Sequence, residues 1–485
     1  MPRPPQLTRR EFVRTATAIA AGAALDGPGI RAARSPANAR PRFQRPLPIP
    51  PVLAPVRRDA TTDYYDVVQR AGRGMVLPGV PTPVWGYDGL WPGPTIRARR
   101  GRTVVVRHTN ALPVPTVVHL HGGETPPDSD GFPTDEVMPR ASRSYTYPNT
   151  QSAATLWYHD HAMDHTGRNI YMGLAGFYLL EDAAEEGLGL PRGACDVPLL
   201  IQRRSCDRGG ELHYNPLRQL GASGPIVTVN GAPTPHLEVA ARKYRFRLLN
   251  GSNATPLRLA LSSGDPLVVI ATDTGLLPAP VPCSSIRLGM AERVEVVVDF
   301  SRLPLGSQLF LVDEAAGGDQ RWVMRFDVAR AEPDDSRVPE RLGEPPELRS
   351  QDASQTRDFV FTGAPRGFPP RAHWTIDGRD FDGDRPIATP RYGDVEIWRL
   401  VNHRRFGLLG MLHTVHIHLV RFLILDRNGR APEPYEQGWK DTVTLDKGDV
   451  VRVVMRFSGH RGRYLVHCHN LEHEDASMMA RYDVV

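Results

Sequence analysis

The feature that most constrains the fold is a pattern that occurs three times at domain-sized intervals. Each copy has a basic or glycine-containing turn, an alternating β-rich run and a closing asparagine, over Arg100–Asn110, Arg242–Asn250 and Gly393–Asn402. The closing asparagines are 140 and 152 residues apart, which is a domain length and too long for a solenoid repeat. We therefore expect three similar β domains that follow one another along the chain.

Composition and the remaining strand patterns support an all-β chain. The 485 residues include 44 glycines and 46 prolines, which favour short strands and turns over long helices. Further runs rich in Val, Ile and aromatic residues predict strands of β-sandwiches. These runs are Glu292–Phe300, Val415–Leu425, Val450–Phe457 and Arg463–His467. We expect domains over residues 50–185, 195–335 and 350–485, preceded by a flexible leader over residues 1–45.

The leader carries the basic character of the chain. Residues 1–45 hold nine arginines against Glu11 and Asp26, so the net charge of +5 becomes negative once they are set aside. We therefore expect no nucleic-acid partner. The apolar run Ala16–Leu25 falls short of the ~20 residues that a membrane helix needs, so no membrane span is expected either.

The order of residues in the leader predicts an export signal. Arg9-Arg10-Glu11-Phe12 and the weakly apolar run Thr15–Ala24 resemble a twin-arginine signal, and a disordered basic tail is the alternative. That route carries proteins already folded, which suits a chain that takes up a cofactor before leaving the cytoplasm. We expect folded export to the periplasm, the cell envelope or the extracellular space.

Ten of the seventeen histidines gather in four short clusters. The clusters are His119-Leu120-His121, His159-Asp160-His161, His413-Thr414-Val415-His416-Ile417-His418 and His467-Cys468-His469-Asn470-Leu471-Glu472-His473. Two clusters lie in the first repeat and two in the third, whereas the equivalent region of the second repeat, Ala254–Ala260, has none. If these histidines bind a metal, the site joins the first and third domains, and the second domain is a spacer without copper.

Side-chain parity divides the clusters into two sites, because residues two apart on a strand face the same side. Eight imidazoles form four such pairs: His119 with His121, His159 with His161, His416 with His418, and His467 with His469. Cys468 lies between the last two histidines and faces the opposite side, and so does His413. Together with His473 and Met478, they form a second site with a thiolate, two imidazoles and a thioether.

The ligand types select the metal. Two imidazoles, a thiolate and a weak axial methionine are the ligands of a blue-copper electron-transfer site. Zinc has no redox chemistry and no use for the thioether. The eight paired imidazoles can hold three further copper ions, and Cys468 connects the two sites through its chain neighbours. The pattern predicts single electrons collected at one site and delivered together at the other.

Each cluster taken alone has a simpler interpretation. A lone His-x-His pair also occurs on protein surfaces and in zinc or cupin-type sites, and His467-Cys468-His469 with His473 matches a structural zinc element. Two clusters in each of two repeats, with matching parity, favour the joint copper interpretation. The other cysteines, Cys195, Cys206 and Cys283, supply at most one disulfide.

With these motifs the chain resembles a multicopper oxidase over nearly all its length after residue 50. The resemblance rests on the blocks His-x-His-Gly, Trp157-Tyr158-His-x-His, His-x-x-His-x-His and His-Cys-His-x₃-His-x₄-Met. The segments Asp128–Gly131, Tyr171–Gly176 and Gly438–Val443 are similar to the branch of bacterial spore-coat laccases and bilirubin oxidases. The resemblance implies three consecutive cupredoxin-like Greek-key β-sandwich domains and four copper ions per chain, one type 1, one type 2 and two type 3.

The resemblance also implies a role for each ligand. His413, Cys468, His473 and Met478 correspond to the type 1 ligands, and His119 and His416 to the type 2 ligands. The type 3 ligands correspond to His121, His159, His161, His418, His467 and His469. Thr414 stands where many relatives have proline, which we expect to loosen the turn at His413. Met479 is the alternative axial residue.

Reduction of O₂ to two waters needs four protons as well as four electrons, so an acid beside the trinuclear cluster is required. Glu474 and Asp130 correspond to carboxylates assigned to proton delivery in this branch, and a solvated loop acid is the alternative for each. Together with Cys468, these two acids are the predicted catalytic residues.

The resemblance implies a laccase-like multicopper oxidase that oxidises a phenol or an aromatic amine. Bilirubin oxidation is the nearest alternative, and a cuprous or metal oxidase is disfavoured because the 11 methionines form no cluster beyond Met478 and Met479. A copper-free envelope scaffold would lack the ligands, and copper storage does not need the connection through Cys468. We expect O₂ and a small reducing substrate as partners, and a monomer.

Overall fold

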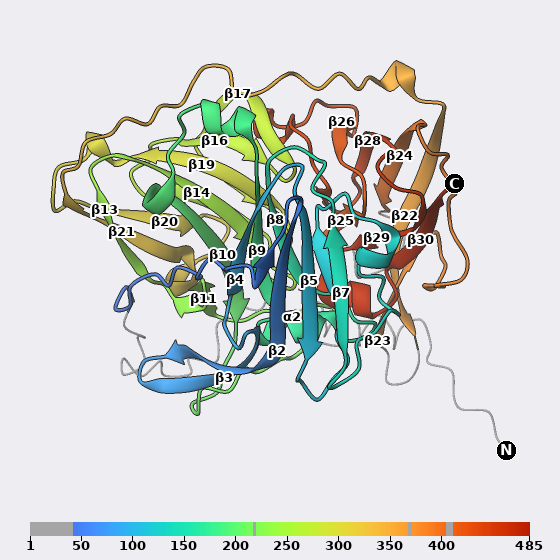
Figure 1. Ribbon diagram of the computed structural model, residues 1–485, viewed down its shortest axis with the longest axis horizontal. Helices are drawn as coiled ribbons and strands as arrows, with labels where there is room; N and C mark the ends of the chain where they lie inside the picture. The colour runs from blue at the N-terminus through green and yellow to red at the C-terminus, as the bar shows by residue number, and fades with distance from the viewer. Residues whose placement is uncertain (1–41, 217–219, 367–370, 404–410) are drawn as a thin grey trace, which may run out of the picture.

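The computed structural model describes residues 42–216, 220–366, 371–403 and 411–485. Within these residues, six β-sheets build three β-sandwiches, which lie at the centre, the left and the right of Figure 1 in chain order. The prediction of an all-β chain with three consecutive sandwiches is confirmed. The predicted export signal lies outside the described residues.

The first sandwich packs a five-stranded sheet against a four-stranded sheet. Its strands are β1 (Arg57–Arg58), β2 (Thr62–Leu77), β3 (Val80–Tyr87), β4 (Gly93–Arg99), β5 (Thr103–Asn110), β6 (Val118–His121), β7 (Ser142–Tyr147), β8 (Ala154–Asp160) and β9 (Ala175–Glu181). One sheet has the order β1-β2-β5-β7 with β3 also on β2, and the other has the order β4-β9-β8-β6. Val104 and Val106 of β5 meet Leu156 and Tyr158 of β8 in one core between the sheets.

The second sandwich is larger, with a seven-stranded and a five-stranded sheet. Its strands are β10 (Asp196–Arg204), β11 (Ile226–Val229), β12 (Ala232–Pro233), β13 (His236–Ala240), β14 (Lys243–Asn250), β15 (Leu257–Leu261), β16 (Leu267–Thr272), β17 (Gly275–Cys283), β18 (Ile286–Leu288), β19 (Arg293–Asp299), β20 (Gln308–Asp313) and β21 (Trp322–Arg330). The sheet orders are β12-β11-β10-β14-β19-β16-β17 and β13-β21-β20-β15-β18. Phe246, Leu259 and Val323 are buried in the core between them.

The third sandwich packs the sheet β23-β22-β24-β28-β26 against the sheet β27-β25-β29-β30. Its strands are β22 (Gln355–Arg366), β23 (Arg371–Ile376), β24 (Val395–Asn402), β25 (His413–Ile417), β26 (Phe422–Arg427), β27 (Thr442–Leu445), β28 (Val450–Arg456), β29 (Gly462–Cys468) and β30 (Met479–Val484). The prediction of one strand over Val415–Leu425 is wrong. The chain turns at Leu419, where φ is 64°, and passes from one sheet to the other.

The three asparagines of the sequence repeat form equivalent hydrogen bonds, one asparagine in each sandwich. Asn110, Asn250 and Asn402 end β5, β14 and β24, and all three are buried. Each side-chain amide donates to two backbone carbonyls of residues later in the chain, at 2.8 to 3.2 Å. The repeat in the sequence is therefore a repeated anchor that holds the next strands against the sheet.

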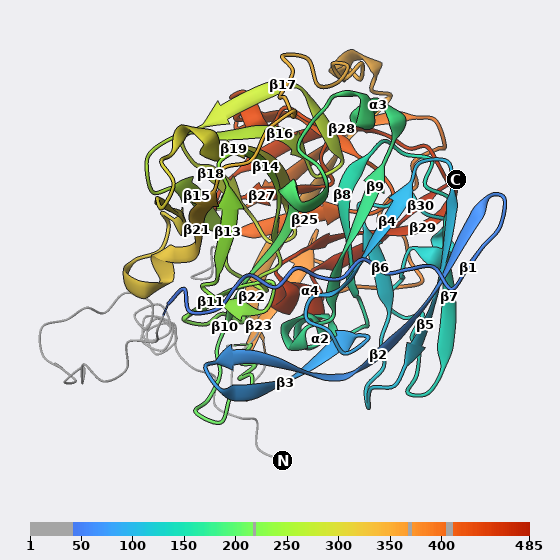
Figure 2. The same ribbon diagram turned by 60° about the vertical axis from the view of Figure 1, so that its left-hand side comes forward.

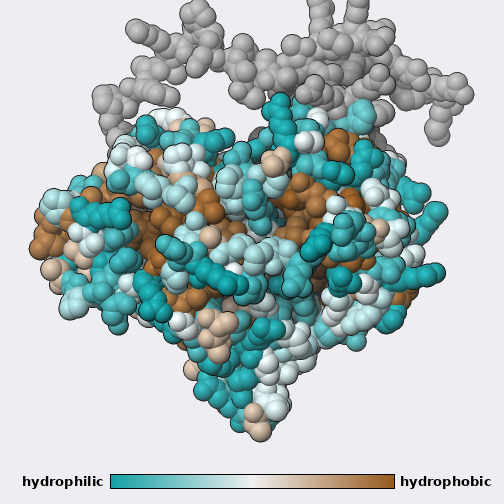
Figure 3. Space-filling view, turned by 90° about the horizontal axis from the view of Figure 1, so that it is seen from above, coloured by the Kyte–Doolittle hydropathy of each residue, from teal (hydrophilic) through white to brown (hydrophobic). Residues whose placement is uncertain are grey.

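Short helices and connectors complete the chain. The α-helices of the described residues are α2 (Thr166–Met172), α3 (Ala183–Gly187) and α4 (Leu471–Asp475). None of the helices in the described part of the chain is long and apolar enough to cross a membrane. The segment between β21 and β22 runs along the top of Figure 1 from the second sandwich to the third. On that face, apolar residues gather in two areas with a hydrophilic band between them (Figure 3).

The end of the predicted leader contacts the second sandwich. Arg42 forms an ion pair with Asp319, and the Phe43 ring packs edge-on against Phe310 and Trp322. The backbone N–H of Phe43 also donates to the carbonyl of Thr234 at 2.9 Å. Residues 42–45 are thus packed against the fold, unlike the flexible segment expected from the sequence.

Candidate metal centre

Four strand ends bring the eight paired histidines together between the first and third sandwiches. In both ribbon views, β25 of the third sandwich lies beside β8 of the first (Figures 1 and 2). The pairs lie at the carboxyl ends of β6, β8, β25 and β29. His119 is the ladder partner of His159, and His416 is the ladder partner of His467. Each sheet therefore presents four imidazoles, and the two sets face each other.

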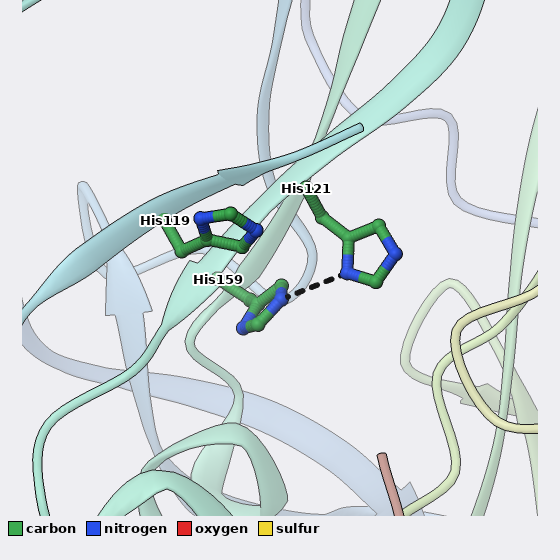
Figure 4. Close-up of side chains that lie close together, drawn as sticks. All are labelled: His119, His121 and His159. Carbon is green, nitrogen blue, oxygen red and sulfur yellow. Dashed lines mark hydrogen bonds between the residues drawn. The ribbon is translucent and has the colours of Figure 1, made fainter. Parts of the chain in front are cut away.

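Rings from the two sandwiches are in direct contact. The His121 ring stacks on His416 with centroids 3.6 Å apart, and His119 stacks on His418 at 3.9 Å. The Nε2 atoms of His119 and His416 are 3.3 Å apart. Figure 4 shows His119, His121 and His159 gathered from β6 and the end of β8, with Nδ1 of His121 3.3 Å from Nε2 of His159.

A second group of three imidazoles lies beside these. The Nε2 atom of His467 is 3.1 Å from Nε2 of His418 and 3.4 Å from Nε2 of His161. When two ligand atoms bind the same metal ion at ~2 Å with a near-tetrahedral angle between them, the two atoms are about 3.3 Å apart. The observed separations therefore suit nitrogens that share metal ions.

Burial keeps these imidazoles in the form that binds metal. All eight side chains are buried, and desolvation lowers the pKa of each ring for which a shift is resolved, to about 4 for His161. An unprotonated imidazole has a free nitrogen lone pair for a metal ion. Both ring nitrogens of His469 are buried and have no hydrogen-bond partner within the described residues. Burying a polar atom without a partner costs free energy of folding, and a bound metal ion would remove that cost. The His469 ring therefore fits a metal site.

Cys468 lies in a separate group, as side-chain parity requires. Its Sγ atom is 3.4 Å from Nδ1 of His413 and 3.6 Å from Nδ1 of His473, and these two nitrogens are 3.1 Å apart. Burial raises the pKa of the Cys468 thiol to about 12, although the backbone N–H of Asn470 donates to the sulfur and lowers it. A bound metal ion would deprotonate the thiol outright, so the donor set fits a soft metal such as copper.

The structure distinguishes the two methionines that the sequence left open. Met478 packs in the same core as Cys468. Its backbone carbonyl accepts from the N–H of Cys468, and its N–H donates to the carbonyl of His473. Met479 begins β30 and packs on the other face, against Phe132 and Leu465. The geometry therefore favours Met478 as the fourth member of the group.

Thr414 lies within β25, where its ladder partner is Thr444 of β27. His413 is the first residue of the same strand and pairs with Leu445. The strand is therefore continuous through both residues, in contrast to the loosened turn that the sequence led us to expect.

The two predicted proton carriers contact the histidine cluster directly. The Oδ2 atom of Asp130 is 2.7 Å from Nδ1 of His418, and its backbone carbonyl is 2.5 Å from Nδ1 of His119. Burial raises the pKa of Asp130 well above its ordinary value. Gly131, with φ of 84°, allows this approach, because a Cβ there would lie 2.4 Å from the Val118 carbonyl oxygen.

Glu474 serves the opposite side of the cluster. Its carboxylate oxygens are 3.1 Å from Nδ1 of His467 and 3.5 Å from Nδ1 of His161. Burial alone would raise the pKa of Glu474, but the neighbouring His161 and His467 outweigh it and hold the pKa at about 2. The structure thus places one buried carboxyl group at each end of the cluster.

Asp441 and Thr442 are site residues that the sequence analysis missed. Asp441 Oδ1 is 3.1 Å from Nε2 of His121, and the Thr442 hydroxyl oxygen is 3.0 Å from the same nitrogen. The backbone carbonyl of Asp441 accepts from Nδ1 of His416 at 2.8 Å. These contacts leave Nδ1 of His121 and Nε2 of His416 facing the cluster. The segment Gly438–Val443 was noted as similar to one branch of the family, and it was the signal available.

The remaining sequence expectations concern copper types and disulfides. Assignment of the ligands to type 1, 2 or 3 copper stays a prediction. In the described residues, three histidine groups overlap through His119 and His418, and the group of His413, Cys468 and His473 shares no residue with them. No disulfide joins the four cysteines, all of which lie in the described residues.

Comparison with known proteins is consistent with this geometry. Residues 71–185 and 351–485 match two family models, each described as multicopper oxidase. A laccase of Bacillus subtilis (strain 168) is 36% identical, covering 91% of this chain and 98% of that protein. A bilirubin oxidase of Albifimbria verrucaria is 38% identical, covering 91% of this chain and 81% of that protein. The crystal structure of a multi-copper oxidase from Pediococcus acidilactici matches with a TM-score of 0.84 at 33% identity, covering 92% of each chain.

Proposed function

Because the chain belongs to the multicopper oxidase family, we propose that it is a laccase-like enzyme that couples one-electron oxidation of phenols or aromatic amines to reduction of O₂ to water. One observation carries this proposal. Cys468, whose sulfur contacts His413 and His473, is bonded in the chain to His467 and His469 of the eight-histidine cluster. A few covalent bonds therefore join the two sites.

Copper is the cofactor that this donor set fits, and when bound it supplies the one-electron steps and the site at which O₂ is reduced. His413, Cys468, His473 and Met478 would hold one ion. The eight paired imidazoles would hold three more. The chain's own contribution is to keep these groups buried and correctly oriented, with the imidazoles unprotonated, so that ions bind without rearrangement of the protein.

The proposed donor site is a surface pocket of about 530 Å³ beside His473. Tyr214, Ala372 and Asp475 are among the residues that line it. His373 of β23 also lines the pocket. The residue after it is Trp374, whose ring stacks on His473 with centroids 3.7 Å apart. An aromatic donor in this pocket would lie close to the type 1 ligands, and the Asp475 carboxyl group offers an acceptor for its O–H or N–H group.

Asp130 and Glu474 are proposed as the groups that supply protons. Both side chains are buried. Asp130 contacts Nδ1 of His418, Glu474 contacts Nδ1 of His467, and both of these nitrogen atoms face away from the cluster. Four protons are consumed for each O₂. The raised pKa of Asp130 lets its carboxyl group hold a proton at Oδ2 and release it to the cluster. Glu474, whose pKa is held at about 2, is ionised, and its carboxylate can accept a proton at Oε2 and pass it on.

The test is to load the full chain with copper and to measure its visible spectrum, its copper content and its O₂ uptake. We expect an intense blue absorption, four copper ions per chain and O₂ uptake driven by a phenol or an aromatic amine. Bilirubin and Cu(I) are assayed beside them, since bilirubin oxidation is the second candidate and rests on the Albifimbria verrucaria relative. Copper bound without O₂ uptake would indicate a scaffold or a storage protein and would overturn the proposal.

Export of the folded protein, to the periplasm, the cell envelope or the extracellular space, is also proposed. It rests on Arg9 and Arg10 with the run that follows them. Replacement of both arginines by lysine should leave the protein in the cytoplasm, as fractionation would measure. We propose that the exported protein is a monomer, which light scattering of the loaded protein would test.

A further inference from the structure

The second sandwich holds no histidine cluster, yet one of its side chains reaches the trinuclear site. Arg293, the first residue of β19, is fully buried and lies where the three sandwiches meet. Its guanidinium makes five hydrogen bonds, and the acceptors belong to all three sandwiches. The acceptors are the carbonyls of Thr155, Ala291 and Asp273 and both carboxylate oxygens of Asp441. An arginine has five N–H donors in a fixed plane, so its position is fully determined by these partners.

The contact that matters for the site is the fork between Arg293 and Asp441. Nη1 is 2.7 Å from Oδ1, and Nη2 is 2.5 Å from Oδ2. The same Oδ1 atom is 3.1 Å from Nε2 of His121 and accepts the Thr442 hydroxyl at 2.7 Å. The arginine therefore sets the plane of the carboxylate that contacts the His121 ring.

The backbone beside His121 is shaped around this fork. Gly122 has φ of 83°, and a Cβ there would lie 2.5 Å from Asp441 Oδ2 and 2.7 Å from Arg293 Nη2. Glycine is the residue that tolerates both this conformation and this approach. The neighbouring Lys440 is held in the same manner, with Nζ 2.8 Å from Asp273 Oδ2 of the second sandwich.

From these contacts we infer that Arg293 is a positioning residue for the trinuclear site, which holds the Asp441 carboxylate so that Nδ1 of His121 faces the copper ions. The inference rests on the proposed function. It assigns the second sandwich a task in the reaction, in addition to that of a spacer. Ligand orientation by residues behind a metal ligand commonly changes metal affinity or activity by 10–100-fold.

The test compares Arg293→Lys with Arg247→Lys in the copper-loaded full chain. Arg247 is the matched control, because it is equally buried in the second sandwich and bonded to both oxygens of Asp196, and it also contacts the first sandwich through the Thr155 hydroxyl. Within the described residues, none of the side chains that accept from Arg247 contacts a histidine, whereas Asp441, which accepts from Arg293, contacts His121. Lysine keeps the charge at either position but cannot bind both oxygens of a carboxylate in one plane.

The readouts are copper content, the blue absorption and the electron paramagnetic resonance spectrum of type 2 copper. The type 2 spectrum reports on Asp441 because the backbone carbonyl of Asp441 accepts from Nδ1 of His416, a predicted type 2 ligand. We expect Arg293→Lys to change the type 2 spectrum, to leave part of the protein with fewer than four copper ions and to slow O₂ uptake about tenfold or more, while the blue absorption is kept. Arg247→Lys should keep all these properties. Asp441→Asn, which keeps the size of the side chain, should reproduce the Arg293→Lys spectrum and decides the question if Arg293→Lys does not fold.

Two results would overturn the positioning role while the proposed function stands. The first is an Arg293→Lys protein with the wild-type type 2 spectrum and full copper content. The second is the same loss of copper and of blue absorption in both lysine variants, since a general loss of stability would then explain it. A wild-type protein without blue absorption or O₂ uptake would instead overturn the proposed function and this inference with it.

Discussion

The second sandwich and its two neighbours share an anchor but differ in the strand that follows it. After the buried asparagine, the first and third sandwiches place histidines on β6 and β25, facing the boundary between them. In the second sandwich the equivalent strand is β15. Its side chains Leu257, Leu259 and Leu261 pack in the core of the second sandwich. The second sandwich shows that the fold of one such domain does not require a histidine cluster.

The second sandwich instead carries buried charge. Arg245 and Arg247 on β14 pair with Asp196, Glu295 and Glu185, and all of these side chains are buried. Glu185 lies in α3, in the chain between the first two sandwiches. The first and third sandwiches thus carry the proposed metal ligands, whereas the second sandwich carries buried ion pairs. The predictions that follow are ordered by the size of the expected effect on this division of tasks.

Cys468→Ser would remove the sulfur ligand through which the site in the third sandwich is connected to the histidine cluster between the first and third sandwiches. Serine is nearly the same size, but its hydroxyl is a poor ligand for copper and gives no charge-transfer band. We expect the blue absorption to disappear and donor-driven O₂ uptake to fall by at least about a thousandfold, which corresponds to ~4 kcal/mol. Cys195→Ser, in the second sandwich, is the control and should keep both. Blue protein with normal O₂ uptake from Cys468→Ser would remove the basis of the proposed function.

Asn250→Ala and Asn402→Ala test whether the shared anchor has the same task in both kinds of sandwich. Each change leaves two buried carbonyl groups without their donor, so each should lower the free energy of unfolding by about 2 kcal/mol. Asn402 also holds Leu445, the ladder partner of His413, so its loss should weaken copper binding at the blue site. Chemical denaturation and blue absorption measure the two effects. Loss of blue colour in Asn250→Ala as well would contradict the division.

Acid should weaken the ion pairs of the second sandwich in a defined range. Burial alone would raise the pKa of Asp196, but Arg247 and Arg245 outweigh it and lower the pKa to about 2. A carboxyl group with a lowered pKa in the folded state stabilises the protein above its ordinary value of 3.8, and this contribution is lost as the pH falls towards 2. The full contribution is about 2 kcal/mol.

Asp196→Asn provides the comparison for this effect. The difference in unfolding free energy between wild type and variant should be constant above about pH 5 and should shrink between about pH 4 and pH 2. Denaturation curves over this range measure it. If the difference in unfolding free energy grew towards low pH, the proposed stabilisation by the ionised Asp196 carboxylate would be wrong.

Met478→Leu should have the smallest effect, because leucine fills nearly the same volume and costs less than about 1.5 kcal/mol. The axial residue tunes the potential of a blue-copper site, so we expect blue protein with a shifted reduction potential. Met479→Leu is the control, since that side chain packs against Phe132 and Leu465. Equal shifts in both variants, or a shift in Met479→Leu alone, would reassign the axial position.

The sequence was sufficient to predict the sandwich fold and the faces of the strands on which the proposed ligands lie. His119 and His121 are two positions apart, as are His467 and His469, and the alternation of a strand places each pair on one face whatever its neighbours are. The same alternation turns Cys468 to the other face. These features are local, so spacing alone determines them.

Tertiary structure decided what contacts the other side of each ligand. Arg293 and Asp441 are 148 residues apart, and no spacing rule connects a strand of the second sandwich with a turn of the third. The break at Leu419 was missed because a continuous apolar run matches one strand as well as two. The sequence by itself determined which faces carry the ligands. The packing of three sandwiches decided which buried charges orient them, because such contacts form when the separate sheets meet.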